Sequence, residues 1–95
     1  MKKIRKRKNN KTKIIEMKLG RFRMKGRSIY GLALLDKNKI LIDSRLKGRV
    51  YMDTLIHEKL HLIFPEWSET LVLKTANQLS SLLWHNSYRK IDNSK

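Results

Sequence analysis

The chain of 95 residues contains no cysteine and only one proline. Disulfides are therefore excluded, and any metal site would have to use histidine and carboxylate ligands. No apolar stretch reaches the length of a transmembrane helix. The basic N-terminus "MKKIRKRKNN" is not followed by the apolar region of a signal peptide. These absences favour a single soluble domain, and we expect a cytoplasmic protein with no membrane partner.

Acidic residues are scarce in the N-terminal part of the chain. Residues 1–27 hold 13 Lys/Arg and one acid, whereas residues 28–95 hold 10 Lys/Arg and seven acids. A basic segment of this kind attracts phosphate backbones or acidic proteins, and a solvated tail is the alternative. We predict that residues 1–12 form a disordered basic arm. Its candidate nucleic-acid contacts are Lys2, Lys3, Arg5, Lys6, Arg7 and Lys8.

Apolar periodicity predicts one α+β domain over residues 13–88, followed by a tail at 89–95. Ile15, Met17 and Leu19 alternate with polar residues, which indicates a strand. The stretches "SIYGLALLD" (28–36) and "ILID" (40–43) predict two more strands, joined by the turn "KNK". We expect these three strands to form a short antiparallel sheet packed on two helices.

Two helices are predicted after a polar loop at residues 44–49. The first runs from about residue 50 to residue 64, where Pro65 ends it. Ile63 and other apolar residues surround much of this helix, as in a central helix between a sheet and a second helix. The second helix runs from about residue 68 to residue 84. Its inward stripe is expected to comprise Glu69, Val72, Ala76, Leu79 and Leu83.

The stretch "HEKLH" at residues 57–61 fits the HExxH pattern. Residues i and i+4 of a helix share a face about 6 Å apart, so His57 and His61 could bind one zinc ion. Glu58 is rotated too far around the helix to ligate alongside them. It could instead accept a proton from metal-bound water. The alternative is two histidines on a partly polar helix face without a metal.

A catalytic zinc usually has three protein ligands, and the candidates for the third are Glu69, Glu66 and His85. The short link at residues 64–68 should fold the second helix back on the first. An inward-facing residue in the first turn of the second helix would then lie near His61, which favours Glu69. Stabilisation of the helix N-terminus is the alternative role of Glu69.

Other residues near the motif have less definite roles. Asp53 lies one turn before His57 and could accept the other ring N–H of this ligand, or cap the helix N-terminus. Tyr51, Tyr88 and His85 are candidates to stabilise an oxyanion, and nothing in their spacing selects one.

At "LIHEKLHLIFPEWSE" (55–69) the chain resembles the zincin metallopeptidases, in particular the very small SprT-like or gluzincin-like metallopeptidases of phages and prophages. The resemblance covers about residues 28–84. It implies that His57, His61 and a downstream residue, for which Glu69 is the candidate, bind zinc, and that Glu58 is the catalytic base. SprT-like domains use a third histidine after the motif. No histidine lies between His61 and His85, which argues against close SprT-like membership.

The resemblance also implies that the strand "SIYGLALLD" pairs with an extended substrate. The leading hypothesis is therefore a zinc-dependent metallopeptidase that acts on a peptide or protein, in the host cytoplasm if the chain is phage-encoded. The alternatives are a basic nucleic-acid-binding protein and a catalytically degenerate zincin that acts through protein contacts.

Overall fold

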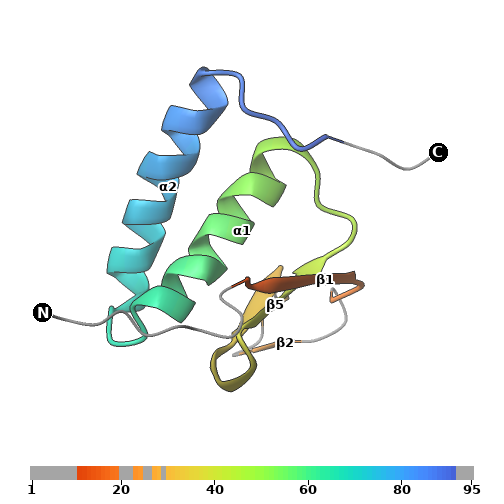
Figure 1. The fold of residues 1–95 in the computed structure, drawn as a ribbon, viewed down its shortest axis with the longest axis vertical. Coiled ribbons are helices and arrows are strands. Elements are labelled where there is room, and N and C mark those ends of the chain that lie inside the picture. Colours follow the sequence, from red (N-terminus) through yellow and green to blue (C-terminus); the bar gives the residue numbers. More distant parts are fainter. Residues whose placement is uncertain (1–10, 20–22, 25–26, 29, 92–95) are drawn as a thin grey trace, which may run out of the picture.

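The computed structural model describes residues 11–19, 23–24, 27–28 and 30–91 (Figure 1). The strands are β1 (Lys13–Met17), β2 (Arg23–Met24), β3 (Arg27–Ser28), β4 (Gly31–Leu34) and β5 (Lys39–Asp43). A 3-10 turn (Leu35–Lys37) joins β4 to β5, and the helices are α1 (Gly48–Ile63) and α2 (Glu69–His85). Most of the predicted arm and residues 92–95 of the predicted tail lie outside the described residues. So do all the candidate nucleic-acid contacts: Lys2, Lys3, Arg5, Lys6, Arg7 and Lys8.

The fold is α+β as predicted, but the main sheet is mixed rather than antiparallel. Its strand order is β1-β5-β4. β4 pairs antiparallel with β5, since a tight turn at Asn38, whose φ is +51°, joins them. β1 instead runs parallel to β5, with Ile15 opposite Leu41. A long connection that includes the β2–β3 pair separates β1 from β4, and such a connection can reverse the direction of the chain.

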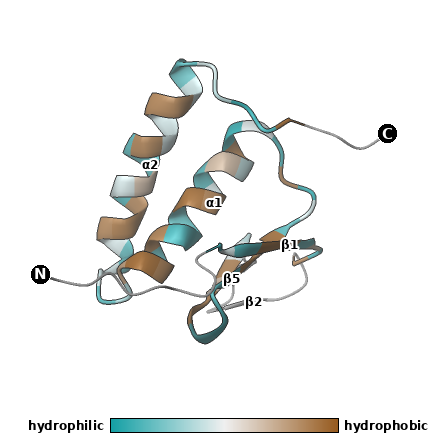
Figure 2. Cartoon of the chain, viewed as in Figure 1, coloured by the Kyte–Doolittle hydropathy of each residue, from teal (hydrophilic) through white to brown (hydrophobic). Residues whose placement is uncertain are grey.

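Helix α1 lies between the sheet and α2 (Figure 1), as its wide apolar surface predicted. It contacts β4 and β5 on one side and α2 on the other. Hydrophobic residues recur along both helices and along β5 (Figure 2). The core residues include Ile40, Ile42, Leu60, Val72 and Ala76, each at most 7 % exposed. The layers are therefore sheet, α1 and α2, and α1 is covered on both sides.

Local signals define the helix hairpin that positions the site. The chain enters α1 at Gly48, whose φ of +59° favours glycine. Phe64, just before the proline, leaves the helical region with φ −124° and ψ 71°, as expected for a residue that precedes proline. The hydroxyl of Ser68 accepts a hydrogen bond from the N–H of Leu71 at 3.1 Å. Ser68 is thus the N-cap of α2, and a link of only five residues, 64–68, reverses the chain.

The inward stripe of α2 differs from the predicted one near its C-terminal end. Leu79 is 40 % exposed, whereas Ser80 is completely buried. Ser80 can face α1 because its hydroxyl donates to Asp53 Oδ1 at 2.9 Å, which satisfies a buried polar group. Ile63, at the last turn of α1, is 52 % exposed rather than in the core. The spacing rule placed Leu79 on the stripe because it does not take into account the hydrogen bond that allows Ser80 to be buried.

The start of the described chain is attached to the domain. Thr12, assigned above to the arm, donates to Asn38 Oδ1 at 3.0 Å and accepts a hydrogen bond from Lys59. Within the described ranges, no helix combines the length and the hydropathy needed to cross a bilayer.

Candidate metal centre

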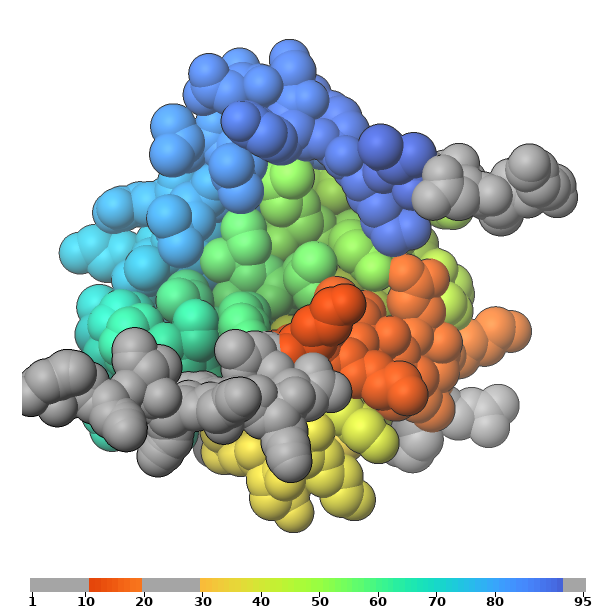
Figure 3. All heavy atoms as spheres, viewed as in Figure 1, coloured from red at the N-terminus to blue at the C-terminus, as the bar shows by residue number. Residues whose placement is uncertain are grey.

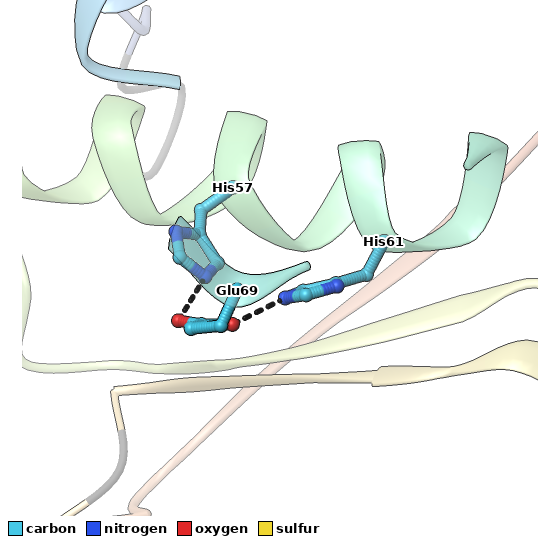
Figure 4. Close-up of side chains that lie close together, drawn as sticks. All are labelled: His57, His61 and Glu69. Atoms are coloured by element: carbon cyan, nitrogen blue, oxygen red, sulfur yellow. Dashed lines mark hydrogen bonds and ion pairs between the residues drawn. The ribbon is translucent and has the colours of Figure 1, made fainter. Parts of the chain in front are cut away.

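The first turn of α2 places Glu69 opposite the two motif histidines of α1 (Figure 4). Glu69 Oε2 lies 3.0 Å from His57 Nε2, and Glu69 Oε1 lies 2.9 Å from His61 Nε2. One potential ligand atom from each of the three side chains lies within 4.8 Å of the other two. The structure therefore brings together the three residues that were favoured as ligands from the sequence.

This donor set fits a divalent metal ion such as zinc. Imidazole nitrogen and carboxylate oxygen bind zinc at about 2.0–2.2 Å, which separates tetrahedral ligand atoms by about 3.3 Å. The observed N–O distances of 2.9 and 3.0 Å join the two histidines to different oxygens of Glu69, and the three ligand atoms lie within 4.8 Å of one another, so modest side-chain movements would bring them to this spacing. The side chain of Glu69 is 68 % exposed and can move away from the histidines, whereas that of His57 is 13 % exposed and is surrounded by other residues. The exposed carboxylate can therefore adjust to an ion more readily than His57, and the side chain of His61 is 26 % exposed.

Glu58 points from α1 toward β4 rather than toward the solvent. A Cβ atom on Gly31 of β4 would lie 3.0 Å from Glu58 Cγ and 3.4 Å from Glu58 Oε2, so the carboxylate lies against this strand. Burial raises the pKa of the Glu58 carboxyl, and the charge of Glu69 adds to this effect, while the two histidines and the Ala33 N–H oppose it. A carboxylate with a raised pKa binds a proton more readily than an ordinary glutamate, which is the property of a general base.

The close approach of β4 to α1 depends on Gly31. A Cβ atom at this position would lie 2.8 Å from Thr54 Cγ2, closer than Cβ contacts in proteins, and 3.0 Å from Glu58 Cγ, a tight contact that requires a small shift. Gly31 was not assigned a role in the sequence analysis. Its signal was present nonetheless, since a glycine inside an apolar strand indicates a bulge or a close backbone approach.

A hollow of about 300 Å³ opens beside the histidines. β4 is an edge strand of the sheet and forms one wall of this hollow. The lining residues are Gly31, Leu32, Ala33, Leu35, His57, Glu58, His61, Pro65 and Glu69. The predicted edge strand and the histidine cluster therefore face one another across a small cleft.

The other two candidates for the third ligand lie apart from this cluster. Glu66 is exposed in the link and is not among the grouped potential ligands of the described chain. His85, at the far end of α2, lies with its Nδ1 2.8 Å from the carbonyl oxygen of Ser81. The geometry therefore selects Glu69 among the three.

The residues with less definite predicted roles have other partners. Asp53 accepts from Ser80 of α2, and no hydrogen bond recorded in the described part of the chain joins it to a histidine. Tyr51 donates to Glu16 at 2.6 Å, and Tyr88 is 60 % exposed. Neither tyrosine lines the hollow beside the histidines, and His85 does not line it either.

Comparison of the chain with protein-family models, with curated proteins and with solved structures gives no match. The structure itself shows a small α+β fold in which His57, His61 and Glu69 form a cluster that could hold a metal ion.

Proposed function

We propose that the protein is a zinc-dependent hydrolase, and specifically a metallopeptidase. The observation that carries the proposal is the convergence of His57 Nε2 and His61 Nε2 on the Glu69 carboxylate, at 3.0 and 2.9 Å. Glu58 lies in the same hollow with a raised pKa. Three ligands beside a separate carboxylate form the arrangement of an open, catalytic zinc site rather than a closed, structural one.

In the proposed reaction, three residues hold the metal and a fourth transfers the proton. Zinc held by His57, His61 and Glu69 would polarise the carbonyl of a scissile bond and lower the pKa of a bound water to about 7. The carboxylate of Glu58 accepts the proton of the attacking water. It then delivers this proton to the nitrogen of the leaving amine, so one carboxylate acts first as base and then as acid.

The position of β4 favours an extended peptide as the substrate. Among the strands of the described residues, β4 pairs with β5 on one side only, so a peptide can add to its other edge as a further strand. Glu58 and Ala33 line the same hollow, and Glu58 Oε2 lies close to Gly31, which places this carboxylate against the strand that would hold the peptide. A backbone held along β4 would bring its carbonyl groups past the histidine cluster.

The first test is the zinc content of the natively purified protein, measured by elemental analysis. We expect about one zinc per chain, its loss in His61→Ala and weaker retention in Glu69→Ala, because each change removes one of three ligands. Glu66→Ala and His85→Ala are the matched controls and should retain the zinc. A wild type that is folded and remains metal-free after zinc is added would overturn the proposal.

The second test separates metal binding from catalysis. Glu58→Gln should retain zinc but lose hydrolysis of a quenched fluorescent peptide library by about 10²–10⁴-fold, the usual contribution of a general base. Hydrolysis that survives this substitution would contradict the role of Glu58. A wild type that binds zinc but cleaves no peptide of the library would favour a catalytically degenerate zincin acting through protein contacts.

The charge of the N-terminal arm favours a second function, the binding of nucleic acid. Residues 1–27 carry 13 of the 23 basic residues and only one acid. Binding through such an arm should weaken steeply with salt, because each neutralised phosphate releases counterions. Replacing the six basic residues between positions 2 and 8 by glutamine should reduce both the affinity for an oligonucleotide and its salt dependence. An unchanged affinity would exclude the arm as the binding element.

A further inference from the structure

A second hollow, called here the α1 groove, lies away from the histidine cluster. Its volume is about 670 Å³, and it shares no lining residue with the hollow beside the histidines. It is bordered by the first half of α1, the end of α2 with the segment that follows, and β1. Figure 3 shows the C-terminal segment (blue) and β1 (orange) on either side of α1 (green). Ligand sites commonly have volumes of about 300–1,000 Å³, so the size suits a bound group.

The lining of the α1 groove combines aliphatic side chains with cations. Its aliphatic residues are Ile14, Leu46, Met52 and Leu55. Its charged residues are Lys47, Arg89, Lys90 and a single acid, Glu16. Glu16 already accepts a hydrogen bond from Tyr51 and lies 3.9 Å from Lys90 Nζ. The groove therefore offers an apolar surface with excess positive charge around it.

Two of the three aromatic rings in the α1 groove lie beside cations, and the third, that of Tyr88, belongs to a residue that is 60 % exposed. The guanidinium of Arg89 lies 3.4 Å from the centroid of the Trp84 ring, and Lys90 Nζ lies 5.5 Å from that of Tyr51. Proteins that bind single-stranded nucleic acid combine a basic groove with several aromatic side chains on which successive bases stack. One exposed ring does not provide such a series, and the aliphatic lining favours an apolar peptide side chain instead.

We propose that the α1 groove binds an acidic segment of a partner protein, with an apolar side chain in the groove and neighbouring carboxylates at the basic residues. Charge complementarity selects this partner, since Lys47, Arg89 and Lys90 outnumber the one acid. A second copy of this chain is disfavoured because each copy carries a net charge of +15. The groove binds its partner whether or not the histidine cluster catalyses hydrolysis.

The test measures binding of a fluorescein-labelled peptide, Glu-Glu-Leu-Leu-Glu-Glu, to the full chain by fluorescence anisotropy. Matched peptides replace the leucines by serine or the glutamates by glutamine. We expect each matched peptide to bind about tenfold more weakly, because one loses the buried apolar contact and the other loses the charge. The serine peptide also measures non-specific attraction to the basic arm, since it retains every carboxylate.

Two pairs of protein variants then locate the site. Ile14→Ser changes an apolar residue of the groove that is 43 % exposed, and its control, Leu73→Ser, changes one outside the groove that is 55 % exposed. Lys47→Glu changes an exposed cation of the groove at the start of α1. Its control, Lys74→Glu, changes an exposed cation outside the groove, on α2. The groove variants should weaken peptide binding about fivefold to tenfold, and the controls less than about twofold.

An oligothymidylate of similar length distinguishes the two classes of partner. The arm binds it through phosphates, so Ile14→Ser and Lys47→Glu should leave its affinity within about twofold of wild type after allowance for the Lys74→Glu control. If both groove variants weaken oligothymidylate binding as much as peptide binding, the groove is a nucleic-acid site and the proposal is wrong. Peptide binding that Ile14→Ser does not weaken would also overturn it.

Discussion

Replacing Gly31 by alanine should force α1 and β4 apart. The new Cβ would lie 2.8 Å from Thr54 Cγ2 and 3.0 Å from Glu58 Cγ, whereas carbon atoms in favourable contact are about 3.5–4.0 Å apart. Thr54 cannot readily turn away, because it is 8 % exposed and its branched side chain has few rotamers in a helix. The helix or the strand must therefore move by roughly 0.7 Å or more, as in other overpacked cores.

The expected cost of Gly31→Ala is worked out from two opposing effects. Overpacking destabilises a core by about 1–3 kcal/mol. The loss of glycine flexibility from the unfolded chain offsets about 0.4–1 kcal/mol of this. A net decrease of about 1–2 kcal/mol in the free energy of unfolding remains, or about 4–15 °C in Tm for a domain of this size. Urea denaturation followed by circular dichroism measures the free energy.

A double-mutant cycle identifies the contact responsible. Thr54→Ser removes Cγ2, so the double variant Gly31→Ala/Thr54→Ser should recover roughly 1 kcal/mol relative to the sum of the single changes. The tight contact with Glu58 Cγ persists in the double variant, so the recovery should be incomplete. A single variant within about 0.5 kcal/mol of wild type, the range of ordinary surface substitutions, would refute the close approach. Additive single changes would show that Thr54 is not the partner.

Three further changes probe the supporting structure. Burial, with a hydrogen bond to the Glu16 carboxylate, raises the pKa of Tyr51 to about 12. Tyr51→Phe should therefore remove the last phase of the ultraviolet titration. Because the folded pKa is the raised one, this stabilisation is complete below the ordinary tyrosine pKa of about 10 and is lost as the pH rises toward 12. The Arg45 side chain holds the pKa of Asp43 well below its usual range, so Arg45→Ala should destabilise the protein at neutral pH. In urea titrations at decreasing pH, the difference from wild type should shrink below the usual aspartate pKa of about 3.9. Ser80→Ala removes a hydrogen bond to a carboxylate of α1 and should cost about 1–2 kcal/mol in urea denaturation, with an unchanged zinc content.

The helix hairpin and its ligand cluster could be predicted because short-range rules determine them. The spacing of His57 and His61 sets a common face by helix geometry alone. Pro65 and Ser68 mark the end of one helix and the start of the next, so the position of Glu69 followed from a short link. These inferences need only local geometry.

Features that depend on the relation between distant segments could not be predicted. The parallel pairing of β1 with β5 is decided by the path of the connection between β1 and β4, and apolar alternation is the same in either direction. The burial of Ser80 requires the carboxylate of Asp53 on another helix. The glycine in an apolar strand indicated a close approach at Gly31, but not its partner Thr54, which lies 23 positions later in the chain.

The division of the ligand cluster between α1 and α2 makes the docking of these helices part of any binding equilibrium at the site. α2 packs on the side of α1 away from the sheet (Figure 1). Each local opening of α2 removes Glu69 from the histidines, so affinity falls by the fraction of time that the hairpin is open. Loosening the contact of the buried Ala76 on α2 should therefore lower the affinity for a metal, and a bound metal should in turn slow amide exchange along α2 because it binds the closed hairpin.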